Sequence, residues 1–335
     1  MTPIFMIGTQ RSGSNLLRLM LNQLSDIASP HPPHILERMF PLVESYGDLD
    51  LDVNYKKLID DICRLVELNP VEWSGITFDR SKIKSHATGR SLLGVYAAIH
   101  DLYTESQGAK TWCCKSLANI KYINQIEEHF ENPKYIYLYR DGRDVALSFQ
   151  KAVVGEKHIY NIATGWSKTQ KIALDFKKLI DKKRFFCISY EELTQGPEKI
   201  ARSLCEFLGV EYVPEILEFH KSNEAKNAAK SSELWGNVTS PIITNNSRKF
   251  LAEMSPANIE IFESVSGNIL DELGYERCRI VLGEEKIFSH DEIDSFNSLN
   301  TKMKQEKMSQ VDEKDKQRRE RQTELLKEIK NRPIA

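Results

Sequence analysis

Two glycines near the start of the chain have the spacing of a phosphate-binding loop. Gly8 and Gly13 lie in "GTQRSGSN", directly after the apolar run "PIFMI", and they are spaced as in the motif G-x-x-x-x-G-K-[ST]. Ser14, however, stands at the position of the lysine, and Asn15 stands at the position of the magnesium-binding hydroxyl. The loop therefore suits a phosphate-bearing donor whose chemistry does not need a metal.

Basic and hydroxyl side chains in this loop, and in a second stretch, can bind anions. Arg11 can pair with phosphate oxygens, and Ser12 can hydrogen-bond to the same group. In "PKYIYLYRDGRDVALSFQK", Arg140 ends an apolar strand and Ser148 lies on the helix that follows. Two separate phosphate sites fit a nucleotide that is phosphorylated at both ends.

A parallel sheet is needed to bring these residues together. Short apolar runs at Ile4–Ile7, Thr111–Cys114, Tyr135–Tyr139 and Phe185–Ile188 predict buried strands, and helical patterns lie between them. The alternation predicts a three-layer α/β fold of the P-loop type, with a central parallel sheet and helices on both faces. The anion sites are then expected at the edge where the strands end.

The pattern also predicts two parts of the chain. Residues 1–285 are expected to form the main domain, and about 35–108 are expected to be a helical insertion over the sheet edge. Residues 286–335 are dense in mixed charge and almost free of glycine and aromatic residues. This composition predicts a solvated, helical tail without the apolar content to join the core.

Composition excludes several classes of protein. A formal net charge of −2 argues against binding of nucleic acid. No stretch is long and apolar enough for a membrane span, and the N-terminus lacks the features of a signal peptide. The six cysteines show no metal-binding spacing, so we expect a cytoplasmic protein.

The motifs, taken in order, resemble the PAPS-dependent sulfotransferase family. "GTQRSGSNLLRLML", "YIYLYRDGRDVALS" and "ISYEELTQGPEKIARSLCEFLGV" carry the resemblance, which extends over roughly residues 3–275. It implies PAPS as donor, PAP as product, no metal, and in-line transfer of a sulfuryl group to a hydroxyl of a small-molecule, lipid, sterol or saccharide acceptor. It also implies a set of residues at the 5′ end of the donor and two at the 3′ end: Arg11, Ser12, Gly13, Ser14 and Asn15, with Arg140 and Ser148.

Four further residues take roles from the same resemblance. Tyr190 in "SYEEL" matches a tyrosine beside the adenine, and Lys115 matches a lysine near the transferred group. Arg248 and Lys249 are candidates for the 3′-phosphate. Five aromatic residues are candidates for an acceptor pocket, although most such residues are core: Phe78, Tyr96, Trp112, Trp166 and Trp235.

Transfer to a hydroxyl needs a base, and histidine is suited to that role near neutral pH. "SPHPPHILERM" places His31 and His34 where related enzymes have a glutamate. His34 is the first choice and His31 the second, and Glu37 and His100 remain alternatives. The His-x-x-His spacing lacks a clear third ligand, so a metal site is not expected.

Two rival functions remain open at this point. An ATP-dependent small-molecule kinase would need the lysine and hydroxyl that Ser14 and Asn15 replace. A non-catalytic nucleotide-binding protein would have no use for a base or for Lys115. A homo-oligomer is possible, and the acceptor cannot be read from the sequence.

Overall fold

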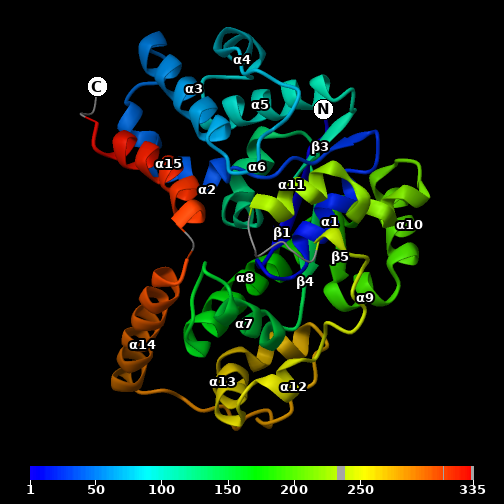
Figure 1. The fold of residues 1–335 in the computed structure, drawn as a ribbon, viewed down its shortest axis with the longest axis vertical. Helices are drawn as coiled ribbons and strands as arrows, with labels where there is room; N and C mark the ends of the chain where they lie inside the picture. Colours follow the sequence, from blue (N-terminus) through cyan, green and yellow to red (C-terminus); the bar gives the residue numbers. More distant parts are fainter. Residues whose placement is uncertain (232–237, 312, 333–335) are drawn as a thin grey trace.

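The predicted α/β fold is confirmed. The computed structural model describes residues 1–231, 238–311 and 313–332. A parallel sheet of five strands, in the order β2-β3-β1-β4-β5, forms its centre, and helices surround it (Figure 1). The strands are β1 (Ile4–Gly8), β2 (Ile27–Ala28), β3 (Thr111–Cys114), β4 (Lys134–Tyr139) and β5 (Phe185–Ser189).

The sheet is covered on both faces because alternate residues of its central strands enter two different apolar clusters. Successive side chains of a strand point to opposite faces, so an unbroken apolar run indicates burial on both. One cluster contains Phe5, Ile7, Tyr135 and Tyr137, and the other contains Ile4, Met6, Ile136 and Leu138.

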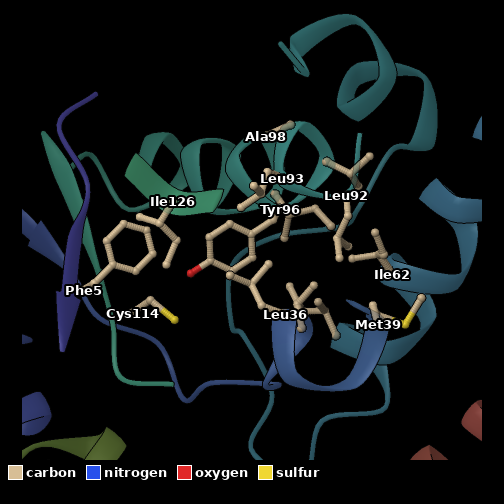
Figure 2. Packing of buried hydrophobic residues seen from close by; sticks show 14 of the residues in the cluster. Phe5, Leu36, Met39, Ile62, Leu92, Leu93, Tyr96, Ala98, Cys114 and Ile126 are labelled. Carbon is tan, nitrogen blue, oxygen red and sulfur yellow. The ribbon is translucent and has the colours of Figure 1, made fainter. Parts of the chain in front are cut away.

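Each face has its own helices. The first cluster includes residues of α2 (Ile35–Met39), α3 (Asp52–Glu67), α4 (Arg80–His86), α5 (Leu92–Ser106) and α6 (Ile123–His129). Figure 2 shows Tyr96 of α5 between Phe5 of β1 and Leu36 of α2. The second cluster includes residues of α1 (Ser14–Leu21), α9 (Tyr190–Gln195), α10 (Pro197–Leu208) and α11 (Asn223–Ser231).

The remaining helices complete the lower half of Figure 1 and the C-terminal segment. A third apolar cluster joins α7 (Gly142–Lys151), α8 (Ile159–Leu179), α12 (Phe250–Glu253) and α13 (Pro256–Glu272). Short 3₁₀ helices span Phe40–Tyr46, Leu117–Tyr122, Lys182–Arg184 and Pro214–Lys221. In the part of the chain that is described, no helix is long and apolar enough to cross a bilayer.

The charged C-terminal segment differs from its prediction. It forms α14 (His290–Ser309) and α15 (Glu313–Lys330), and α15 packs on α3. Leu325 and Ile329 are 2% and 1% exposed and belong to the largest apolar cluster. The expectation that this segment cannot join the core was therefore wrong, because two apolar residues one helical turn apart give even a highly charged helix a buried face.

Candidate active site

Both glycines of the first loop are required by close contacts. Gly8 has φ 137°, and a Cβ atom there would lie 2.2 Å from the carbonyl oxygen of Leu138 on β4. Gly13 has φ 88°, and a Cβ atom there would lie 2.5 Å from Cδ2 of Tyr190. Only glycine fits both the positive φ and the missing space. The loop thus lies flat against β4 and Tyr190 and leads directly into α1, whose first N–H groups favour an anion.

Arg11 lies within this loop in an unusual backbone conformation. Its φ is 71°, in the left-handed region that non-glycine residues adopt mainly at functional or strained positions. Its Nε donates a hydrogen bond of 2.9 Å to Oγ of Ser148 on α7. Burial and the nearby Arg140 lower the pKa of Arg11, but a guanidinium remains charged at neutral pH. The loop and α7 therefore meet through residues that the sequence assigned to opposite ends of the donor.

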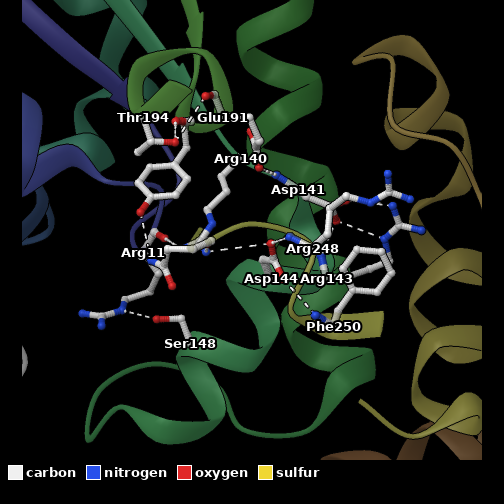
Figure 3. A network of polar contacts seen from close by, with 12 residues as sticks. Arg11, Arg140, Asp141, Arg143, Asp144, Ser148, Glu191, Thr194, Arg248 and Phe250 are labelled. Carbon is white, nitrogen blue, oxygen red and sulfur yellow. Dashed lines mark hydrogen bonds and ion pairs between the residues drawn. The ribbon is translucent and has the colours of Figure 1, made fainter. Parts of the chain in front are cut away.

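Arg140 lies beside the same loop. Its NH1 donates to the carbonyl oxygen of Arg11 at 3.2 Å, and its guanidinium lies 4.3 Å from the centre of the Tyr190 ring. The Tyr190 hydroxyl accepts a hydrogen bond of 2.9 Å from Nδ2 of Asn246. Figure 3 shows Arg11, Arg140 and Ser148 together, at the point where the first loop meets α7. The two arginines thus form one positively charged corner.

Three buried polar atoms at this corner have no hydrogen-bond partner among the described residues. They are Oγ of Ser12, Nδ2 of Asn15 and Nε of Arg140. A buried donor without a partner costs free energy, and such atoms are rare in folded proteins. Asn15 and Arg140 belong to the lining of a cavity, so a bound anion could accept hydrogen bonds from their nitrogen donors, whereas Ser12 does not line it. The residues present therefore fit a phosphate-bearing ligand.

Lys115 reaches the loop from the end of β3. Its Nζ lies 3.4 Å from Oδ1 of Asn15. Burial, followed by the charges of Arg18 and Arg11, lowers the pKa of Lys115 to about 7. Lys115 thus lies at the expected position, at the edge of the sheet that carries the first loop. An anion bound there would restore its full charge.

His34 directly precedes α2, and its side chain contacts Ser116, the residue after Lys115. Its φ is 58°, and its Nδ1 lies 2.9 Å from Oγ of Ser116. Burial, then Lys115 and Arg38, lower the pKa of His34 to about 3, so the imidazole is neutral at physiological pH. With Nδ1 donating to Ser116, Nε2 carries the lone pair that can accept a proton. Glu37 lies one turn further along, with its Oε2 3.8 Å from Nδ1 of His34.

A cavity of about 730 Å³ joins these groups. It brings together most of the predicted site residues, from the first loop, the His31–Glu37 segment and the ends of β3 and β4. Those lining it are Arg11, Gly13, Ser14, Asn15, His31, His34, Glu37, Lys115, Arg140, Ser148, Tyr190 and Lys249.

Comparison with known proteins gives the family. Residues 3–214 match the model of the sulfotransferase family. The chain belongs to this family. That match contains the first loop, Lys115, Arg140, Ser148 and Tyr190.

Curated relatives and solved structures carry the same activity in their names. The chain is 23% identical over 282 residues to protein-tyrosine sulfotransferase A of Caenorhabditis elegans, covering 82% of this chain and 67% of that protein. It is 23% identical to the protein-tyrosine sulfotransferase of Drosophila melanogaster, covering 69% of this chain but only 42% of the fly protein. The sulfotransferase domain from the curacin biosynthetic pathway aligns with a TM-score of 0.58 at 22% identity, covering 83% of this chain and 99% of that domain. This structural similarity supports the fold.

The other two histidine candidates of this sulfotransferase differ in position. His31 lines the cavity, and its carbonyl oxygen accepts hydrogen bonds from Asn69 Nδ2 at 3.1 Å and Trp73 Nε1 at 2.7 Å. His100 is buried in the core of α5, with its Nδ1 2.8 Å from the carbonyl oxygen of Tyr96, and it does not line the cavity. Within the described ranges, no three His, Cys, Asp or Glu side chains are grouped so that they could hold a metal ion.

Several other candidates lie outside the cavity lining. Ser12 is fully buried behind the loop, and the backbone N–H of Arg248 donates to Asp144 Oδ2 at 2.6 Å. Four aromatic candidates are core residues, and Trp235 lies outside the described residues: the four are Phe78, Tyr96, Trp112 and Trp166.

Some lining or supporting residues had no role in the sequence analysis. Ser116, which fixes the His34 ring, follows Lys115 directly and could have been suspected from that position. Asn246, Gln322 and Thr323 also line the cavity, and nothing in their sequence context indicates it. They come from segments far along the chain, and only folding brings them to the site.

Proposed function

We propose that this sulfotransferase takes its sulfuryl group from PAPS and transfers it to a hydroxyl of its acceptor. The observation that carries the proposal is the meeting of the partly buried Arg11 with the buried Arg140 in a cavity that also contains His34 and Lys115. Nitrogen donors of Asn15 and Arg140, which also line this cavity, have no hydrogen-bond partner among the described residues. A donor with phosphate at both ends would satisfy both arginines.

The residues that would hold the donor divide into two groups. Arg11, the loop N–H groups and Asn15 would hold its 5′ end, next to Lys115. Arg140 and Ser148, with Lys249 at the cavity wall, would hold its 3′-phosphate. The Tyr190 ring would lie beside the adenine, and Arg248 would support this region through its backbone.

The reaction needs a base next to the acceptor hydroxyl and positive charge next to the phosphate oxygen that leaves. Bound PAPS supplies the activated sulfuryl group, and its departure leaves PAP. Nε2 of His34 takes the proton from the acceptor hydroxyl as the new oxygen–sulfur bond forms. Arg11 and Lys115 stabilise the negative charge on the phosphate oxygen that is released. A sulfuryl group carries less charge than a terminal phosphoryl group, so Ser14 and Asn15 can replace the lysine and hydroxyl of a magnesium-dependent loop.

Two measurements test the donor. PAP should raise the melting temperature by mass action, and AMP should raise it much less, because only PAP fills both phosphate sites. Labelled PAPS, incubated with sugars, phenols, sterols, lipids and a tyrosine-containing peptide, should give a labelled product. Equal stabilisation by AMP and PAP would contradict the second phosphate site.

The kinase alternative makes the opposite prediction for metal. Turnover with PAPS should survive EDTA, since neither Ser14 nor Asn15 reproduces the motif that holds magnesium. Transfer from ATP that is restored only by Mg²⁺ would favour the kinase, and ligand binding without turnover of any donor would favour a non-catalytic protein.

The cellular location is a further part of this proposal. The six cysteines are free thiols, which fits a reducing cytoplasm.

A further inference from the structure

The C-terminal segment supports two sides of the cavity, one through α14 and the other through α15. Figure 1 shows α14 in the half of the molecule that contains α7 and α8, and α15 beside α2 and α3. Asn300 of α14 accepts hydrogen bonds from the backbone N–H groups of Lys157 and His158, at 2.8 and 3.0 Å. The loop before these residues supplies Ala152 and Val154 to the cavity wall. The segment thus supports one wall through α14 before it reaches the other wall through α15.

On the other side, α15 forms part of the wall itself. Gln322 is 3% exposed and lines the cavity with its exposed neighbour Thr323. Its Oε1 accepts a hydrogen bond of 2.6 Å from NH1 of Arg38, and its Nε2 donates one of 2.8 Å to the carbonyl oxygen of Leu65. Gln322 is therefore fixed between α2 and α3, and its partner Arg38 lies four residues after His34.

Further contacts make this position of α15 stable. Leu325 and Ile329 are buried against the core, as described above. Arg332 pairs with the buried carboxylate of Asp61 and, at 2.7 Å, with Glu328. Glu328 also receives a hydrogen bond of 2.8 Å from Arg64 of α3. Apolar burial and the charged network at its C-terminal end thus hold α15 in a fixed position beside the cavity.

We propose that α15 is the acceptor wall of the enzyme, and that Gln322 and Thr323 select a polyhydroxylated acceptor such as a sugar. The proposal rests on the proposed function, because it assigns the acceptor end of the same cavity. This end lies around His34, away from the Arg140–Tyr190 corner, and its side chains mostly form hydrogen bonds: Glu37, Arg38, Asn69, Gln322 and Thr323. A sterol would need a closed apolar pocket, whereas amide, hydroxyl and charged groups match the hydroxyls of a sugar.

The segment is also outside the region that defines the family. The family match ends at residue 214, whereas α15 begins at Glu313. The proposed acceptor wall therefore comes from a part of the chain that the family model does not cover, whereas Arg11, Arg140 and Ser148 lie within the match.

The test compares three acceptor probes with labelled PAPS and the full chain: methyl β-D-glucopyranoside, 4-nitrophenol and cholesterol. We expect transfer to the glycoside. Thr323→Val should raise its KM about three- to tenfold, the scale of one lost hydrogen bond, and Gln322→Ala should raise it more. The ratio of kcat/KM for the glycoside to that for 4-nitrophenol should fall in both variants, while the melting shift with PAP stays unchanged.

Lys327→Ala is the matched control, because Lys327 is exposed on the same helix and does not line the cavity. It should leave the ratio unchanged. Thr323 is exposed, so its variant should fold even if Gln322→Ala does not. Variants at 322 and 323 that behave like Lys327→Ala would overturn the role of α15, and absence of transfer to the glycoside would overturn the acceptor class. Loss of the PAP melting shift in the wild type would instead refute the proposed function.

Discussion

The two ends of the cavity are built in different ways. The donor end, around Arg11 and Arg140, is formed by loops at the ends of neighbouring strands, and its residues lock one another in place. The acceptor end, around His34, is formed by the start of α2 and by α15, which comes from the far end of the described chain. The sheet fixes the first end, whereas helices packed on its side form the second. Acceptor preference can therefore change without disturbing the donor site.

The largest difference between the two ends is expected when the proposed base, His34, is removed, because turnover should fall while donor binding is kept. His34→Ala should lower kcat by roughly 10²- to 10⁴-fold, the usual contribution of a general base, and leave the melting shift with PAP unchanged. His34→Gln should be nearly as poor, because an amide cannot take the proton. Steady-state kinetics with any accepted hydroxyl compound measures this, and near-normal turnover would transfer the role to His31 or Glu37.

The next effect concerns stability at the acceptor end. Leu325→Ala should lower the free energy of unfolding by about 2–5 kcal/mol, the usual range for a fully buried leucine, while PAP still binds the folded protein. Urea unfolding of this variant and of Lys327→Ala, which should change stability by less than about 0.5 kcal/mol, gives the comparison. Equal stabilities for the two variants would show that α15 is the solvated tail that the sequence indicated.

A smaller effect should be confined to the donor end. Arg140→Ala should weaken PAP binding by roughly 10- to 100-fold, the scale of hydrogen bonds to a charged group, and should leave AMP binding nearly unchanged. Titration calorimetry with both nucleotides measures the difference. An equal loss for AMP would place Arg140 at the shared 5′-phosphate rather than at the 3′-phosphate.

The smallest effect is a dependence on pH where the two ends meet. Lys115 has its pKa lowered to about 7, so it loses its charge as pH rises, and kcat/KM should fall about fivefold between pH 7 and 8. His34 has its pKa lowered to about 3, so the acidic limb should lie below the ordinary histidine range. In the pH profile of kcat, both the acidic and the alkaline decline should lie at higher pH than in the profile of kcat/KM, because a bound anionic donor raises the pKa values of His34 and Lys115. Lys115→Met should remove the alkaline limb.

The lowered pKa of His34 also makes the free energy of unfolding depend on pH. Its pKa is lower in the folded protein than in the unfolded chain, so the unfolded chain binds the proton more readily. The contribution of His34 to stability is therefore complete above about pH 6.5 and is lost as pH falls toward 3.

The sequence predicted the donor end better than the acceptor end, for physical reasons. Long apolar runs such as Tyr135–Tyr139 identify buried strands, and residues at their ends must meet at one edge. The two-residue strand β2 was too short to give a pattern. His100 looked like a candidate base by residue type alone, yet it packs in the core beside Tyr96.

Residues of the acceptor end left weaker signals. Leu325 and Ile329 are isolated among charged residues, so composition concealed the buried face of α15. Gln322 is an ordinary polar residue in the sequence, and its role follows only from the packing of α15 between α2 and α3. Long-range packing of this kind cannot be read from local periodicity.

The position of β1 in the sheet has a consequence for synthesis of the protein. β1 ends at residue 8, but it pairs with β3, which begins at residue 111, and with β4, which begins at residue 134. During synthesis on the ribosome, β1 therefore stays unpaired until more than a hundred further residues have been added and its first partner strand has been made. At about 5–20 residues per second, this takes roughly 5–20 s, during which both edges of the future central strand are open to other chains. Expression yield should therefore depend on chaperones that bind the nascent chain during this interval.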